Sequence, residues 1–127
     1  MDPITHVFFT IILRLGQIDP WFILGSVLLD VDKLFTYSKG HLRGYKSRTS
    51  FHELPFASLF LSMASVINMN LCFGIISHLL LDFVVGETRP FFPFKNDIVD
   101  YNLELKYKFV VGAVIWLVGL LVLLAVR

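Results

Sequence analysis

The stretch FVVGAVIWLVGLLVLLAV, from Phe109 to Val126, runs for eighteen residues without a charge. That length is close to the roughly 20 residues that an α-helix needs to cross the hydrocarbon core of a bilayer. Lys106, Tyr107 and Lys108 come directly before it, where residues that anchor a helix at the membrane interface are found. We therefore predict a transmembrane helix over residues 108–127.

The composition of the whole chain also indicates a membrane protein. Of the 127 residues, 56% are hydrophobic and 17% are charged, and the mean hydropathy is +0.72, whereas soluble domains carry about 25% charged residues. A soluble fold of this size has too large a surface for its volume to bury so many apolar side chains. The net charge of +1 excludes the massed basic face of a nucleic-acid-binding protein. We expect membrane lipids, and no nucleic acid, as partners.

Two shorter apolar segments lie near the N-terminus. Ile4–Leu13 contains His6 and is short enough to be typical of an interfacial or tilted helix. Pro20–Leu29 starts with a proline, which the first turn of a helix tolerates, and Asp19 is suited to cap that helix.

The segment Leu54–Leu81 decides the number of helices. Its only ionisable side chains are Cys72 and His78. One continuous helix would measure about 42 Å, which exceeds the hydrocarbon core of about 30 Å. The alternative is a turn at Asn68–Asn70, because asparagine side chains bond nearby backbone groups. Hydropathy alone leaves both possibilities open, and the turn leads to an all-α, multi-pass bundle of about five membrane segments in a single domain, residues 1–127.

Loop charge predicts the orientation of this bundle. The loop Tyr37–Ser50 carries basic residues and no acid, which is typical of cytoplasmic loops. Counting five segments from it places the N-terminus and the loop Gly86–Lys108 on the same side. We predict a multi-pass protein of the cell membrane.

The rare ionisable residues of the apolar segments are candidates for function, because such groups are costly in a membrane. Asp2 and His6 are four residues apart, as are His78 and Asp82, and this spacing places each pair on one helical face. Imidazole and carboxylate groups are ligands for a divalent ion such as Zn2+. Alternatively, the carboxylate orients the imidazole through the ring nitrogen that does not bind the metal, or the pairs only form hydrogen bonds between helices.

The turn at Asn68–Asn70 would bring these residues to one end of the bundle, whereas one long helix would separate His52 from His78 by about 39 Å. Their clustering therefore favours the turn. Asp30 and Asp32 are about 200° apart around a helix, so both reach one site only if the helix ends there. The predicted metal ligands are His6, Asp30, Asp32, His52, His78 and Asp82. Whether Asp2 or His41 contributes is left open.

Three residues are candidates for catalysis at such a metal. Glu53, or whichever of Asp30 and Asp32 is not a metal ligand, is a candidate general base, so Asp32 is also a candidate catalytic residue. Arg48 precedes His52 by four residues and is placed to stabilise a developing anion.

The same residues carry a resemblance to a known family. Four stretches occur in one order: D-P-I-T-H (residues 2–6), G-S-V-L-L-D-V-D (25–32), R-T-S-F-H-E-L (48–54) and G-I-I-S-H-L-L-L-D-F-V-V-G (74–86), followed by P-F-F-P-F (90–94). Over residues 1–94 the chain resembles the YdjM-like family of inner-membrane-associated, metal-dependent hydrolases. It departs from the family's usual motifs where Leu29 replaces a proline and where the stretch from Arg48 to His52 lacks a first histidine.

The resemblance implies a membrane-bound hydrolase that depends on a divalent metal, most simply Zn2+. A site at the cytoplasmic membrane face predicts a lipid or lipid-linked ester or phosphoester as substrate. Two non-enzymatic alternatives remain: an ion or proton carrier, and a scaffold that uses a structural metal or polar cluster.

Overall fold

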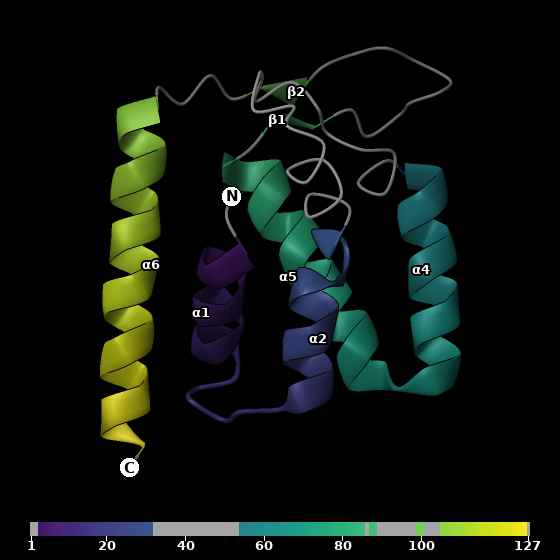
Figure 1. The fold of residues 1–127 in the computed structure, drawn as a ribbon, viewed down its shortest axis with the longest axis horizontal. Coiled ribbons are helices and arrows are strands. Elements are labelled where there is room, and N and C mark those ends of the chain that lie inside the picture. The colour runs from purple at the N-terminus through teal and green to yellow at the C-terminus, as the bar shows by residue number, and fades with distance from the viewer. Residues whose placement is uncertain (1–2, 32–53, 86, 89–98, 101–104, 127) are drawn as a thin grey trace.

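The computed structural model describes residues 3–31, 54–85, 87–88, 99–100 and 105–126. Their helices are α1 (Pro3–Leu13), α2 (Pro20–Leu28), α4 (Leu54–Ile67), α5 (Met69–Val85) and α6 (Leu105–Ala125) (Figure 1). Two-residue strands, β1 (Glu87–Thr88) and β2 (Val99–Asp100), pair antiparallel above the helices. Apart from this pair, the regular secondary structure of the described residues is helical, as predicted.

Helices α4 and α5 form the predicted hairpin. α4 ends at Ile67 and α5 begins at Met69, so Asn68 alone separates them. The Asn68 side-chain oxygen accepts a hydrogen bond of 2.8 Å from the backbone N–H of Asn70. The amide thus supplies the local bond that favours a turn here, and the alternative of a single long helix is wrong.

Helix α2 begins as the sequence predicted. The Asp19 carboxylate accepts hydrogen bonds from the backbone N–H groups of Trp21 and Phe22 at 2.9 and 3.1 Å. The other oxygen of Asp19 accepts a 2.6 Å hydrogen bond from the side-chain amide of Asn70. One carboxylate therefore caps α2 and ties it to the start of α5.

Helix α5 is the centre of the bundle, with α1, α2 and α4 packed around it, while α6 packs on α1 (Figure 1). α2 and α5 cross where Gly25 meets Gly74. A Cβ on Gly25 would overlap the carbonyl oxygen of Leu71, and one on Gly74 would overlap that of Phe22. Glycine lets two membrane-type helices approach to backbone contact, and the crossing lies one turn from the site described below.

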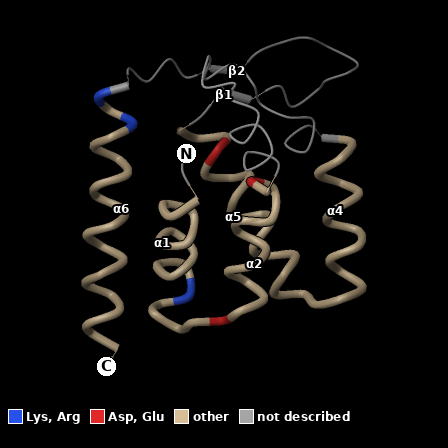
Figure 2. Tube along the Cα trace, in the orientation of Figure 1, with Lys and Arg blue, Asp and Glu red and all other residues tan. Residues whose placement is uncertain are grey.

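The described helices bury polar side chains beside a hydrophobic core around Leu29, Leu71 and Ile75, and they expose many large apolar side chains. The buried polar and charged residues are Thr5, His6, Thr10, Ser26, Asp30, Ser77, His78 and Asp82. Large hydrophobic side chains instead point outward along α4, α5 and α6, among them Leu59, Phe73 and Leu117. The coloured charges of Figure 2 lie near the two ends of the helices and leave the middle of the bundle uncharged.

Helix length bears on how the bundle meets a membrane. Among the described residues, one helix, Lys106–Ala125, is long and apolar enough to cross a bilayer, which agrees with the predicted C-terminal transmembrane helix. Three shorter apolar helices cover Pro3–Leu13, Pro55–Ile67 and Met69–Val85.

Candidate metal centre

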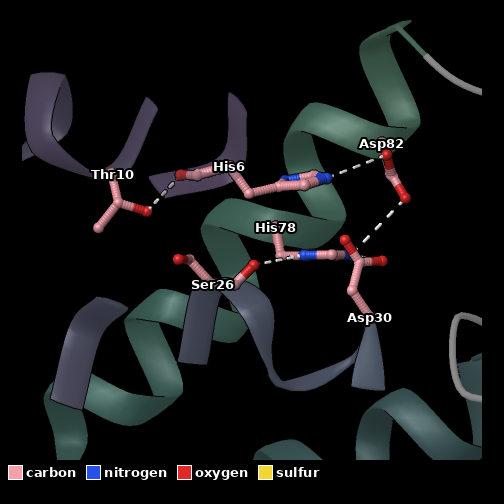
Figure 3. Close-up of polar contacts among 6 residues, drawn as sticks. All are labelled: His6, Thr10, Ser26, Asp30, His78 and Asp82. Carbon is pink, nitrogen blue, oxygen red and sulfur yellow. Dashed lines mark hydrogen bonds and ion pairs between the residues drawn. The ribbon is translucent and has the colours of Figure 1, made fainter. Parts of the chain in front are cut away.

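Four ionisable side chains from three parts of the chain meet inside the bundle (Figure 3). His6 comes from α1, His78 and Asp82 come from one face of α5, and Asp30 follows directly after α2. Their exposed fractions are 1% for His6, 0% for His78 and 3% for each aspartate. Buried ionisable groups are stable only when they are paired or bind an ion, so this cluster is the main candidate for function.

The tautomer of His78 follows from its contact with α2. Its Nδ1 lies 2.6 Å from the carbonyl oxygen of Ser26, and because a carbonyl only accepts, Nδ1 must donate. In a neutral ring the other nitrogen, Nε2, then carries a lone pair. A backbone carbonyl is one of the partners that orient metal-binding histidines in proteins.

The lone pair of His78 faces oxygen acceptors. Nε2 lies 3.6 Å from Oδ1 of Asp30 and 3.6 Å from Oδ2 of Asp82. Two ionised carboxylates and a lone pair repel one another unless a proton or a cation lies between them. The distances exceed the roughly 2.7–3.2 Å of an N–H···O hydrogen bond. They are close to the edge of about 3.4 Å of a tetrahedron with metal–ligand bonds of about 2.0–2.1 Å, which favours a cation.

His6 completes the cluster from α1. Its Nε2 lies 3.5 Å from Oδ1 of Asp82, and its ring stacks on that of His78 with centroids 3.8 Å apart. Neither ring nitrogen of His6 has a hydrogen-bond partner among the described residues. Ligand atoms of His6, His78 and Asp82 all lie within 4.8 Å of one another, so the group is able to hold a metal ion.

Neighbouring contacts hold the two histidine-bearing helices in place. Within α1 the Thr10 hydroxyl donates a 2.8 Å hydrogen bond to the His6 carbonyl, and from α6 the Trp116 indole donates one of 2.9 Å to the Thr5 hydroxyl, which ties α1 to α6. On the other side, the close approach at Gly25 and Gly74 brings the Ser26 carbonyl to His78. The ligands therefore sit on helices fixed by their own packing.

The structure brings together four of the predicted ligands: His6, Asp30, His78 and Asp82. α2 ends at Leu28, which meets the condition under which Asp30 could turn toward the site. The other predicted site residues, Asp32, Arg48, His52 and Glu53, lie outside the described residues, as do Asp2 and His41.

Sequence reasoning missed the backbone part of the site. The Ser26 carbonyl carries no side-chain signature, so only a structure reveals it. The glycines that position it were visible, because glycine on an apolar helix indicates a close helix crossing. Pairing Gly25 with Gly74 would have placed α2 against the His78 face of α5.

Comparison with protein-family models, with curated proteins and with solved structures finds no match to this chain. The resemblance to the YdjM-like family stays a prediction from the quoted motifs. The geometry of the cluster is therefore the basis for a functional assignment.

Proposed function

We propose that this chain is a multi-pass membrane hydrolase that depends on divalent metal bound at the cluster of His6, Asp30, His78 and Asp82. The observation that carries the proposal is the buried Nε2 of His78, whose proton is placed on Nδ1 by Ser26 and whose lone pair faces two carboxylates. Nitrogen and oxygen donors of this kind suit Zn2+, which is our candidate metal.

The distribution of side chains supports the membrane part of the proposal. The interior of the described helices holds polar as well as apolar side chains, large hydrophobic groups cover their outside, and charges gather near the two ends (Figure 2). In lipid, ionisable residues face the bundle interior and pair with one another. We propose that α1, α2, α4 and α5 are short membrane segments beside the longer α6, with the basic loop Tyr37–Ser50 on the cytoplasmic side.

The protein side chains each have a role in this chemistry. A divalent metal bound at the cluster would lower the pKa of a coordinated water and polarise the scissile bond. Ser26 holds the His78 ring with Nε2 toward the site, and Asp82 approaches both imidazoles. From the sequence, we propose Glu53 or Asp32 as the general base, Arg48 as the group that stabilises the developing anion, and His52 as a further ligand.

The surroundings of the cluster favour a substrate that arrives from the lipid. The four side chains are buried in a bundle whose outer surface is largely apolar. An amphiphile can place its polar group beside such a bundle while its chains stay in the bilayer. We therefore propose a lipid or lipid-linked ester or phosphoester as the substrate class.

Hydrolysis in vesicles tests the proposal. The full chain is reconstituted in phospholipid vesicles that hold fluorescent phosphoester or carboxylic-ester lipids, and product release is followed with and without Zn2+. We expect Zn2+-dependent release that falls at least about 100-fold in Asp82→Asn, which keeps the shape of the side chain but removes its charge. Ser58→Ala, on the exposed side of α4, is the matched control. Unchanged release in Asp82→Asn or in chelator would contradict the proposal, as would no release of either lipid from the Zn2+-saturated protein.

A further inference from the structure

The two imidazoles of the cluster lie face to face. The rings of His6 and His78 are inclined by only 14°, with centroids 3.8 Å apart. The Asp82 carboxylate is divided between them: Oδ1 lies 3.5 Å from Nε2 of His6, and Oδ2 lies 3.6 Å from Nε2 of His78. Figure 3 shows the rings as parallel layers with Asp82 beyond their edges.

This stacking makes it difficult for one ion to bind both rings. The lone pair of an imidazole nitrogen lies in the ring plane, so a metal binds in that plane. With centroids 3.8 Å apart, an ion midway between the rings would lie up to about 1.9 Å out of each plane, against a metal–nitrogen bond of about 2.0–2.1 Å. Parallel rings instead direct their lone pairs to two separate points.

We propose that the cluster holds two divalent cations bridged by Asp82. One position lies between Nε2 of His6 and Oδ1 of Asp82. The other lies among Nε2 of His78, Oδ2 of Asp82 and Oδ1 of Asp30. The ring separation of 3.8 Å falls within the metal–metal spacing of about 3.5–4 Å in two-metal hydrolytic sites.

The two positions differ in their affinity for a cation. The His78 position has two carboxylate oxygens at 3.6 Å, and the Ser26 carbonyl holds its ring in the required tautomer. The His6 position has one carboxylate oxygen from the described residues, and Nδ1 of His6 has no hydrogen-bond partner among them. Such support of a metal-binding imidazole changes affinity by about 10–100-fold. The first cation therefore binds at His78 and the second, more weakly, at His6.

This inference rests on the proposed function. Counting the metal ions bound per chain distinguishes a failure of the two-cation site from a failure of the proposed function. The full chain, purified in detergent, is saturated with Zn2+, freed of loosely held metal and analysed for zinc per chain. We expect two zinc ions in the wild type and in Ser58→Ala, one in His6→Ala, and fewer than one in Asp82→Ala, which removes the bridge. One ion in the wild type, lost equally from His6→Ala and His78→Ala, would overturn the two-cation site but leave the proposed function standing. No bound ion would overturn both.

A second measurement does not depend on any variant folding. The wild-type chain is loaded with Mn2+ and examined by electron paramagnetic resonance at low temperature. Two ions sharing a carboxylate at this spacing give the spectrum of a spin-coupled pair. At half saturation the spectrum is that of an isolated ion, because the His78 position fills first. An isolated-ion spectrum at full saturation would overturn the inference.

Discussion

The indole Nε1 of Trp116 donates a hydrogen bond of 2.9 Å to the hydroxyl of Thr5, the residue before His6. This bond relates the depth of the cluster to the long helix α6. Lys108 lies eight residues, or about 12 Å, before Trp116, and the indole leans toward that end of its helix. At the other end of α6, Gly16 lies against Val126. Thr5 and His6 are therefore level with the apolar part of α6, roughly one to two turns from its lysines.

Depth in the bilayer gives the first prediction. The chain has two tryptophans, and Trp21 lies beside Asp19 at the end of α2 away from the cluster. In Trp21→Phe the remaining Trp116 should be quenched more by spin labels in the middle of the lipid chains than by labels on the headgroups. In Trp116→Phe the remaining Trp21 should be quenched more by labels on the headgroups than by labels in the middle of the lipid chains. Stronger headgroup quenching of Trp116 would place the cluster at the membrane surface.

The second prediction concerns the hydrogen bond between Trp116 and Thr5. Trp116→Phe keeps an aromatic side chain but removes the N–H donor and part of the indole, so the free energy of unfolding should fall by at least about 1 kcal/mol. Thermal or denaturant unfolding in detergent measures the change. Trp21→Phe is the control, because Asp19 contacts the backbone N–H of Trp21 rather than its ring. Equal stability of the two variants would show that the bond contributes nothing measurable.

The third prediction concerns the crossing of α2 and α5 at Gly25 and Gly74. In Gly74→Ala the new Cβ would overlap the Phe22 carbonyl, so α2 must move away from α5. We expect a loss of about 1–3 kcal/mol in stability and, because the Ser26 carbonyl leaves His78, about 10–100-fold weaker metal binding. Calorimetric titration with Zn2+ measures the affinity.

Gly119→Ala is the matched control for this prediction. A Cβ there meets the Phe8 side chain, with its nearest ring carbon at 2.7 Å, rather than the α2–α5 contact. Its metal affinity should equal that of the wild type. If both variants keep full affinity, the glycine crossing does not position the site.

The fourth prediction concerns the effect of metal removal on stability. A ligand that binds only the folded state stabilises it by about 2.7 kcal/mol at a concentration 100 times its Kd. A chelator should therefore lower the unfolding midpoint of the Zn2+-loaded wild type and change that of Asp82→Ala, which lacks the bridging carboxylate, much less. Equal midpoints of the wild type with and without chelator would instead support a cluster that only bonds the helices together.

Local patterns in the sequence predicted much of this fold. The Asp19 cap, the turn at Asn68 and the placement of His78 and Asp82 on one face depend on residues a few positions apart, so spacing alone reveals them. The convergence of His6 with α5 was predictable because short apolar segments and a turn leave few arrangements for the polar residues.

The arrangement within the site could not be predicted in the same way. The stacking of His6 on His78 depends on how α1 lies against α5, and the tautomer of His78 depends on the α2–α5 crossing. Both are relations between helices distant in sequence. Whether Asp30 reaches the cluster depended on where α2 ends, and neither the sequence pattern nor hydropathy sets that end to within one residue.

X-ray absorption at the zinc edge of the purified, Zn2+-loaded chain tests the metal site most directly. The proposed ligands predict nitrogen and oxygen neighbours at about 2.0–2.2 Å and the outer-shell scattering of imidazole. A sulfur neighbour at about 2.3 Å, which only Cys72 or a methionine could supply, or a spectrum of zinc surrounded by water alone, would contradict the site.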